Sequence, residues 1–288
     1  MKPSYITREF IDNFIKQAIE EDIGEGDHSS LSTIPKELEG KANLLIKEDG
    51  VIAGLELADE IFKQVDPKLK ADFFKKDGDS VLVGEVAFAL HGPVRSILGA
   101  ERLVLNCMQR MSGIATYTHH LCELIKSTKT KILDTRKTSP TLRPLEKWAV
   151  LIGGGRNHRF ALYDMIMLKD NHIDYAGGIT SALAFAADYL VRTGKDLKIE
   201  IETRNLNEVY EVLQSGGADI IMLDNMDVST MKKATDLICG RMKTEASGGI
   251  TEKNIEEIAK SGVDYISVGA LTHSAKSLDM SLKAEIEK

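Results

Sequence analysis

Basic side chains gather in one part of this chain. Between residues 134 and 169 there are seven lysines or arginines but only three aspartates or glutamates, although the net charge of the whole chain is −7. Guanidinium and ammonium groups suit the oxygens of carboxylates and phosphates. This local excess predicts a pocket for a small polyanion, with four candidate cations: Arg136, Lys137, Arg159 and Lys169.

Six apolar segments after residue 130 are typical of buried strands separated by helices, and we expect the second to run from 161 to 168. The last four end at Glu202, Asp224, Ser247 and Gly269, which are 22, 23 and 22 residues apart. This spacing is the length of one strand–helix unit, so it predicts a parallel sheet, and a barrel rather than an open sheet. No Gly-x-Gly-x-x-Gly follows the first strand, which argues against a dinucleotide-binding fold.

Two carboxylates and two glycine-rich strand ends join the cations at the predicted barrel mouth. Strand alternation turns Glu200 and Glu202 inwards, and Asp224 ends the next strand. As oxygen ligands, Glu202 and Asp224 could hold Mg²⁺, or they could simply pair with the basic residues. The segments 247–249 and 268–270 could offer backbone N–H groups to phosphate, or could be tight turns.

The first part of the chain reads as a mixture of helices and short strands. Residues 10–19 have helical apolar spacing, and 57–65 form a shorter amphipathic helix. Asp49-Gly50 predicts a hairpin between two strands. From Arg95 onwards the pattern is helical, and we expect Ser112-Gly113 to interrupt or bend that helix.

Bulk properties exclude several classes of protein. The chain has 288 residues, 43% of them hydrophobic and 28% charged, which is typical of a globular protein with one large domain or two. A pI of about 5.6 argues against a nucleic-acid or anionic-membrane binder. Three cysteines without disulfide or metal spacing, and an N-terminus without an apolar signal core, predict a cytoplasmic protein.

The residues by themselves therefore predict a barrel enzyme that acts on a phosphorylated, anionic substrate with Mg²⁺. They leave the reaction open. One alternative is an aldolase or isomerase that uses Lys137 or Lys169 as a Schiff-base amine. Another is a binder of phosphorylated metabolites without catalytic activity.

Ordered sequence blocks over nearly the whole chain resemble those of the quinolinate phosphoribosyltransferase family. The blocks are EDIGEGDHSS, DGVIAGLELADEIF, HGPVRSILGAERLVLNCMQRMSGIAT, DTRKTSPTLRPLEKWAV, GGGRNHRFALYDMIMLKDNH, IEIE, MLDN, SGGI and SVGALTHS. The resemblance implies an open, TIM-like α/β barrel with fewer than eight regular strands, and an N-terminal α/β sandwich. We expect the sandwich in residues 1–112, joined by 273–288, and the barrel in 113–272.

The resemblance also implies a reaction and a role for each matching residue. Phosphoribosyl pyrophosphate and quinolinate would give nicotinate mononucleotide, pyrophosphate and CO₂, in NAD biosynthesis. The family works as a homodimer or larger assembly, and Arg102 resembles the arginine that each subunit lends to its partner's site. By motif, the quinolinate carboxylates would be held by Arg136, His158, Arg159 and Lys169. The phosphates would be held by Lys137, Ser247, Gly248 and Gly269, with His273 near them, and Glu202 and Asp224 would serve the ribose hydroxyls and Mg²⁺.

Three positions depart from the family pattern. The family has glycine where Thr141 and Ala161 stand, and tyrosine where Trp148 stands. Threonine and alanine disfavour a positive φ, so we expect small differences in those loops. A related enzyme that transfers phosphoribose to nicotinate without decarboxylation is the nearest alternative, but the dense cationic pocket favours two substrate carboxylates over one.

Overall fold

The structure is a computed structural model that describes residues 2–285. Its contacts divide the chain into two compact units. Unit 1 contains the chain up to His119, residues Ser139–Gly154 and the chain from Ser274, and unit 2 contains His120–Thr138 and Gly155–His273. Residues 286–288 of the predicted C-terminal segment 273–288 lie outside the described residues.

Unit 2 is built on one parallel sheet of six strands in the order β6-β11-β10-β9-β8-β7. The strands are β6 (Lys131–Leu133), β7 (Ile166–Leu168), β8 (Ile199–Thr203), β9 (Ile220–Asp224), β10 (Lys243–Ser247) and β11 (Tyr265–Ser267). The first strand pairs with the last, and within residues 2–285 no ladder joins β6 to β7. The predicted open α/β barrel with fewer than eight strands is therefore confirmed.

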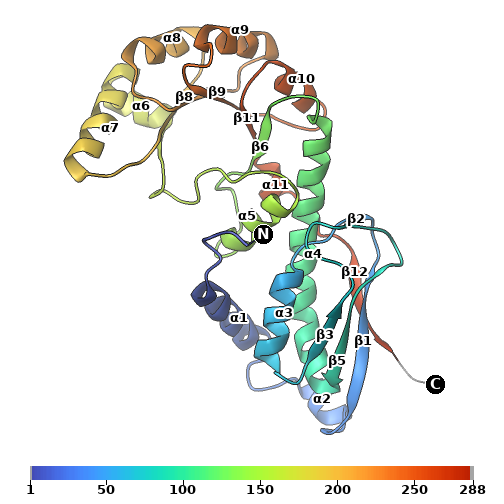
Figure 1. Cartoon of the computed structure of the whole chain (residues 1–288). Coiled ribbons are helices and arrows are strands. Elements are labelled where there is room, and N and C mark those ends of the chain that lie inside the picture. The colour runs from blue at the N-terminus through green and yellow to red at the C-terminus, as the bar shows by residue number, and fades with distance from the viewer. Residues whose placement is uncertain (1, 286–288) are drawn as a thin grey trace. The chain divides into compact units, whose positions relative to one another are not determined.

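Helices follow the strands of unit 2 and form an arc around the sheet (Figure 1). They are α6 (Asp170–Ala176), α7 (Ile179–Thr193), α8 (Leu206–Ser215), α9 (Val228–Ile238), α10 (Ile255–Lys260) and α11 (Ala270–His273). Side-chain caps define where two of them begin: Asn205 accepts the N–H of Glu208, and Asp227 accepts the N–H of Thr230. The helix starts therefore directly follow the strand ends that carry the polar residues.

The predicted buried strand at 161–168 is wrong for its first five residues. β7 begins at Ile166, and the preceding residues form a loop in which Leu162 and Tyr163 are 69% and 71% exposed. The carboxylate of Asp164 accepts the N–H groups of Phe160 and Ala161 at 2.6 and 2.7 Å. This local turn competes with strand formation, and the apolar composition alone did not reveal it.

Unit 1 contains an antiparallel sheet in the order β12-β1-β5-β3 and a separate two-stranded ladder, β2-β4. The strands are β1 (Glu39–Ile46), β2 (Gly50–Val51), β3 (Lys70–Phe73), β4 (Ser80–Val81), β5 (Val86–Pro93) and β12 (Met280–Glu285), and the helices are α1 (Arg8–Asp22), α2 (His28–Thr33), α3 (Leu55–Val65), α4 (Val94–Leu124) and α5 (Arg143–Ile152). No described helix is long and apolar enough to span a membrane.

The predicted hairpin at Asp49-Gly50 is wrong. β1 pairs with β5 and β12, whereas Gly50 and Val51 pair with β4. The carboxylate of Asp49 accepts the N–H of Val83 at 2.7 Å, so this turn residue contacts the chain just after β4. The Asp-Gly pair marks a change of direction, but the partner strand is β4, where Gly50 pairs with Val81 and Val51 with Ser80.

The predicted interruption at Ser112-Gly113 is also wrong, because α4 is continuous over 31 residues. A Cβ atom on Gly113 would lie 1.8 Å from the carbonyl oxygen of Lys276. The buried hydroxyl of Ser112 accepts the N–H of Ala53 at 2.9 Å and donates to its carbonyl at 3.1 Å. These residues are small because two other backbone segments pack against the helix there, and not because the helix ends.

Thr141 has a φ of +66°, whereas Ala161 has no positive φ. At position 141 a threonine thus adopts a backbone conformation that favours glycine. A threonine in this conformation carries backbone strain, and the expected difference in loop shape from the family stays a prediction.

Gly113→Ala should destabilise unit 1, because the added methyl group would overlap the Lys276 carbonyl. We expect the free energy of unfolding to fall by about 2–3 kcal/mol. Gly99→Ala is the matched control in the same helix, since its Cβ would only touch Ile23 at 3.7 Å. That variant should gain up to about 1 kcal/mol from helix propensity. Urea unfolding of both variants measures the difference, and equal stabilities would contradict the packing role of Gly113.

Candidate active site

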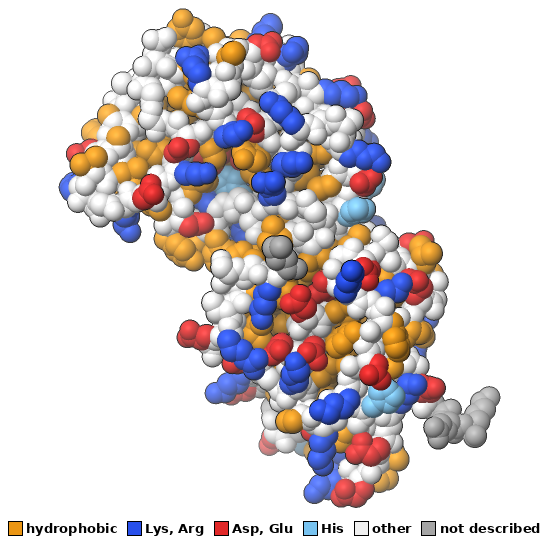
Figure 2. Space-filling model, in the orientation of Figure 1, with side chains coloured by type: hydrophobic (Ala, Val, Ile, Leu, Met, Phe, Trp, Pro, Cys, Tyr) orange, Lys and Arg blue, Asp and Glu red, His pale blue; other side chains and the backbone are white. Residues whose placement is uncertain are grey.

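A pocket of about 900 Å³ lies at the carboxyl ends of the strands of unit 2. On the face shown in Figure 2, Lys and Arg side chains border a hollow of this unit in which a histidine is visible. Eleven of the twelve site residues predicted from sequence line the pocket: Arg136, Lys137, His158, Arg159, Lys169, Glu202, Asp224, Ser247, Gly248, Gly269 and His273. Arg102 does not line it.

Lys169 and Glu202 form an ion pair across neighbouring strands. Lys169 follows β7 and Glu202 lies on β8, and Lys169 Nζ is 2.8 Å from Glu202 Oε1. The N–H of Asp170 donates to the other oxygen, Oε2, at 3.2 Å. Both carboxylate oxygens of Glu202 therefore have a partner, and its side chain has one defined orientation.

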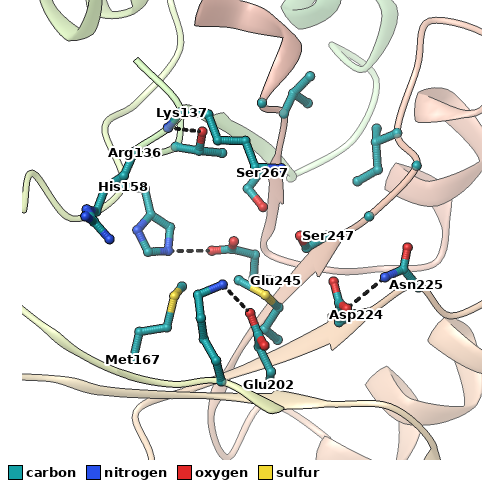
Figure 3. A pocket seen from close by; sticks show the side chains of 18 of the residues that line it. Arg136, Lys137, His158, Met167, Glu202, Asp224, Asn225, Glu245, Ser247 and Ser267 are labelled. Atoms are coloured by element: carbon teal, nitrogen blue, oxygen red, sulfur yellow. Dashed lines mark hydrogen bonds and ion pairs between the residues drawn. The ribbon is translucent and has the colours of Figure 1, made fainter. Parts of the chain in front are cut away.

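Asp224 ends the next strand and faces the same pocket (Figure 3). Burial and the negative charge of Glu202 raise the pKa of the Asp224 carboxyl above its usual value. Asn225 donates to Asp224 Oδ2 from Nδ2 at 2.8 Å, which partly offsets this effect. Two carboxylates that repel each other in a partly desolvated pocket favour a cation between them.

Asn225 is a site residue that the sequence analysis missed. It adopts a left-handed conformation with φ +53°, and its N–H donates to the carbonyl of Ser247 at 2.9 Å. Its side chain lies so close to β10 that a Cβ on Gly248 would be 2.1 Å from Asn225 Oδ1. Asn225 therefore links Asp224 to the glycine loop, and glycine is required at 248.

Arg136 and Arg159 place two guanidinium groups in the pocket. Burial, and then the charge of Arg136, lower the pKa of Arg159. Arg159 Nη1 donates to the carbonyl of Met165 at 3.3 Å, while the buried Nε of Arg136 has no hydrogen-bond partner. Two cations under mutual repulsion, one with an unused donor, form a site for an anion.

His158 lies between this cationic region and two glutamates inside the barrel. Its Nε2 is 2.9 Å from Glu200 Oε2 and 3.4 Å from Glu245 Oε2, and both glutamates are fully buried. Burial and the charge of Glu245 raise the pKa of Glu200 to about 7. Strand parity predicted that Glu200 faces inwards, but nothing in the sequence pointed to its pairing with Glu245 or with His158.

The other end of the pocket combines Lys137 with the loop after β11. The hydroxyl of Thr272 donates to the carbonyl of Lys137 at 2.8 Å, which fixes the backbone beside the lysine. A Cβ on Gly269 would come within 3.1 Å of both Lys137 and His273. Glycine thus lets a lysine and a histidine approach the backbone at a place where α/β barrels commonly bind phosphate.

Comparison with known proteins places the chain in a family. Residues 27–112 match the N-terminal domain, and residues 114–283 the C-terminal domain, of quinolinate phosphoribosyl transferase. The chain belongs to the quinolinate phosphoribosyl transferase family.

Relatives match over nearly the full length of the chain. A chloroplastic nicotinate-nucleotide pyrophosphorylase [carboxylating] from Oryza sativa subsp. japonica is 50% identical over 95% of this chain and 77% of its own length. A probable nicotinate-nucleotide pyrophosphorylase [carboxylating] from Bacillus subtilis (strain 168) is 45% identical over 91% and 89%. The crystal structure of NadC from Streptococcus pyogenes has a TM-score of 0.93 at 40% identity, covering 98% and 99% of the two chains.

Arg102, which the family resemblance assigns to a neighbouring subunit's site, is an exposed residue of α4 in unit 1. Most of the apolar residues near Arg102 on this helix are buried within the chain itself. Val104, Leu105 and Met108 are buried, whereas Leu98 remains 39% exposed. The predicted apolar face of this helix is therefore mostly used within the single chain.

In this member of the quinolinate phosphoribosyl transferase family, Gly248→Ala should weaken pyrophosphate binding more than Gly249→Ala does. Both glycines have positive φ, at +90° and +61°, so both alanines share backbone strain. Only the Gly248 methyl group would collide with Asn225, which holds Asp224, whereas nothing lies within 4 Å of a Cβ at Gly249. Calorimetric titration with inorganic pyrophosphate should show at least about tenfold weaker binding for Gly248→Ala alone. Equal losses would rule out the Asn225 contact as the cause.

Proposed function

We propose that the chain transfers phosphoribose from phosphoribosyl pyrophosphate to quinolinate with decarboxylation, giving nicotinate mononucleotide, pyrophosphate and CO₂ in NAD biosynthesis. The observation that carries the proposal is a single pocket with two chemically different halves. One half holds the guanidinium groups of Arg136 and Arg159, and the other holds Lys137 beside glycine backbone. Glu202 and Asp224 complete the same pocket.

The cationic half suits an aromatic dicarboxylate. Arg136 and Arg159 each offer a planar fork of donors, and Lys169 offers a third charge on the neighbouring strand. The carboxylates of quinolinate would offset both the burial of Arg159 and its repulsion from Arg136, which together lower the pKa of Arg159. Three cations also favour two carboxylates over the single carboxylate of nicotinate. The non-decarboxylating transfer to nicotinate is therefore the second candidate and not the first.

The other half suits the ribose and the phosphates. Glu202 and Asp224 would hold the ribose hydroxyls, and Lys137 with the backbone of Ser247, Gly248 and Gly269 would hold phosphate oxygens. The two carboxylates also fit Mg²⁺, since a hard cation prefers oxygen ligands. It would offset both the burial and the repulsion from Glu202 that raise the pKa of Asp224. When bound, Mg²⁺ would neutralise part of the pyrophosphate charge.

In the proposed reaction the ring nitrogen of quinolinate supplies the electron pair for a new bond to ribose C1. The bond from C1 to pyrophosphate breaks, and its electron pair leaves with the pyrophosphate oxygen. The pyridinium that results accepts the electrons of the adjacent carbon–carboxylate bond when CO₂ departs, and that ring carbon then takes a proton. Glu202 and Asp224 stabilise positive charge at C1, and Lys137 stabilises negative charge on the leaving oxygens. No protein nucleophile is required.

At Lys169 the Schiff-base alternative would require an ion pair to break. Lys169 Nζ lies 2.8 Å from the carboxylate of Glu202, so the amine is not free to attack a carbonyl carbon. Trapping with borohydride in the presence of substrate would still detect such an adduct directly.

CO₂ release tests the proposed reaction. The protein is incubated with quinolinate labelled at the carboxylate next to the ring nitrogen. Labelled CO₂ should appear only when phosphoribosyl pyrophosphate and Mg²⁺ are both present, with one nicotinate mononucleotide formed for each CO₂. Turnover of nicotinate without any CO₂ from quinolinate would identify the second candidate instead, and binding without turnover would identify a metabolite-binding protein.

We also propose a homodimer in which each site is completed by Arg102 of the partner. The support is that Arg102 is an exposed cation outside its own chain's pocket, on a helix where Leu98 is exposed as well. A two-fold arrangement would deliver Arg102 to both sites at once. A larger assembly of such dimers is compatible with this arrangement.

The proposed location is the cytoplasm, supported by three free cysteines among the described residues.

Subunit mixing tests the shared site. Arg102→Ala and Lys137→Ala proteins should each be nearly inactive when prepared separately. After subunit exchange, a mixed dimer holds one doubly defective site and one intact site, so random exchange should restore roughly a quarter of wild-type activity. Native mass spectrometry confirms exchange. Activity that stays at the level of the separate variants despite exchange would show that Arg102 is not shared.

A further inference from the structure

A buried carboxylate joins the two segments that carry Arg136 and Arg159. Asp134 comes directly after β6 and is fully buried. Its Oδ1 accepts the N–H of His158 at 2.8 Å, and its Oδ2 accepts an N–H of the Asn157 side chain at 2.6 Å. Both oxygens of one carboxylate therefore hold the segment just before Arg159, and Arg136 lies only two residues after that carboxylate.

The side chain of Asp134 takes the place of a backbone acceptor at the end of a short parallel ladder. Arg156 is bridged in parallel to Leu133. Its N–H donates to the carbonyl of Ile132 at 2.9 Å, and its carbonyl accepts the N–H of Asp134 at 3.1 Å. In a regular parallel ladder the N–H of His158 would donate next to the carbonyl of Asp134. It donates to the carboxylate instead, so the side chain continues the connection where β6 has ended.

The guanidinium groups need this support because they repel each other. Burial, and then the charge of Arg136, lower the pKa of Arg159. Like charges in a partly desolvated pocket separate unless the structure holds them in place. Arg159 is held at its far end, where Nη1 donates to the carbonyl of Met165 at 3.3 Å. The contacts of Asp134 hold its backbone end, next to the segment that leads to Arg136.

Lys137 has backbone contacts of its own, although it lies only three residues after Asp134. Its N–H donates to the hydroxyl of Thr135 at 3.0 Å, and its carbonyl accepts the hydroxyl of Thr272 at 2.8 Å. Loss of the Asp134 contacts should therefore displace Arg159 relative to Arg136 more than it displaces Lys137.

We propose that Asp134 is a positioning residue: its carboxylate holds the segment before Arg159 beside β6, and so sets the separation at which Arg136 and Arg159 face the two carboxylates of quinolinate. This inference rests on the proposed function. Asp134 does not line the pocket, so it acts through the two arginines and not on the substrate. It gives a fully buried aspartate a role that the proposed reaction does not assign.

An exchange of two side chains tests the geometry. Asn157→Asp would place a second carboxylate where an N–H now donates to Asp134 at 2.6 Å, and it should weaken quinolinate binding at least about tenfold in calorimetry. In the double variant Asp134→Asn, Asn157→Asp, the new amide can donate to the new carboxylate while its oxygen still accepts the N–H of His158. The double variant should therefore bind quinolinate within about threefold of the wild type.

A second ligand and a second aspartate provide the controls. Affinity for inorganic pyrophosphate in the presence of Mg²⁺ should stay within about threefold in every variant, because Lys137 is held separately. Asp264 is the matched aspartate, since its carboxylate joins the amino ends of β10 and β11 at the opposite edge of the same sheet. It accepts the N–H of Thr244 at 3.1 Å and lies 2.9 Å from Lys243 Nζ. Asp264→Asn should lower the stability of the protein without changing either affinity.

Wild-type affinity for quinolinate in Asn157→Asp would overturn the proposal, as would a double variant that binds no better than Asn157→Asp. Equal losses for quinolinate and pyrophosphate would also overturn it, because they would show a general loosening of the site. If Asn157→Asp does not fold, Asn157→Ala removes the Oδ2 contact alone and should show the same selective loss for quinolinate. Wild-type affinity in that variant would contradict the positioning role.

A wild-type protein that binds no quinolinate would refute the proposed function itself. Hydrogen exchange tests the Asp134 contact separately, without any ligand. We expect the amide of His158 to exchange at least about a hundredfold more slowly than in an unstructured peptide of the same sequence. Unprotected exchange at this amide would overturn the contact, and protection that is lost in Asp134→Ala would support it.

Discussion

Like charges held close together at one end of a parallel sheet are the constraint on which this structure depends. Three such pairs occur in unit 2: Arg136 with Arg159, Glu202 with Asp224, and Glu200 with Glu245. Each pair is partly or fully removed from water, so each needs a counter-charge. The deepest pair has one within the chain, in His158. Of the two pairs nearer the mouth, Glu202 has a partial counter-charge in Lys169. The remaining charges of these two pairs have opposite signs, so the pocket suits an anion and a cation together.

The fold creates this constraint through the geometry of its strands. Parallel strands bring their carboxyl ends to one edge, and alternation sends every second side chain inwards. In register, Met222 lies between Glu202 on one side and Glu245 on the other. An apolar side chain therefore separates two carboxylates in the same row across the sheet, which limits their repulsion. The next layer inwards contains Glu200, whose charge His158 meets from the loop beside β6.

The sequence predicted the features that depend on the spacing between strands and on the alternation of side chains along a strand. The 22-residue spacing located the later strands, and alternation placed Glu200 and Glu202 inside the barrel. Prediction from the sequence failed where a contact with a distant part of the chain determines the local structure. Gly113 accommodates the backbone of Lys276, and Gly50 pairs with Val81, and neither partner is visible in a local pattern. Asn225 was missed for the same reason, because its role in the site depends on its contacts with the end of β10.

Lys169 links the two halves of the pocket electrostatically. It lines the same pocket as Arg136 and Arg159 and yet forms its ion pair with Glu202, which we propose to hold the ribose hydroxyls. While the pair is intact, the positive charge of Lys169 weakens the field that Glu202 exerts on a neighbouring cationic centre. An anionic ligand that draws Lys169 away leaves Glu202 more strongly negative, with the N–H of Asp170 still holding its other oxygen. Under the proposed function, an anion in the arginine region would therefore strengthen the electrostatic stabilisation that Glu202 offers at ribose C1.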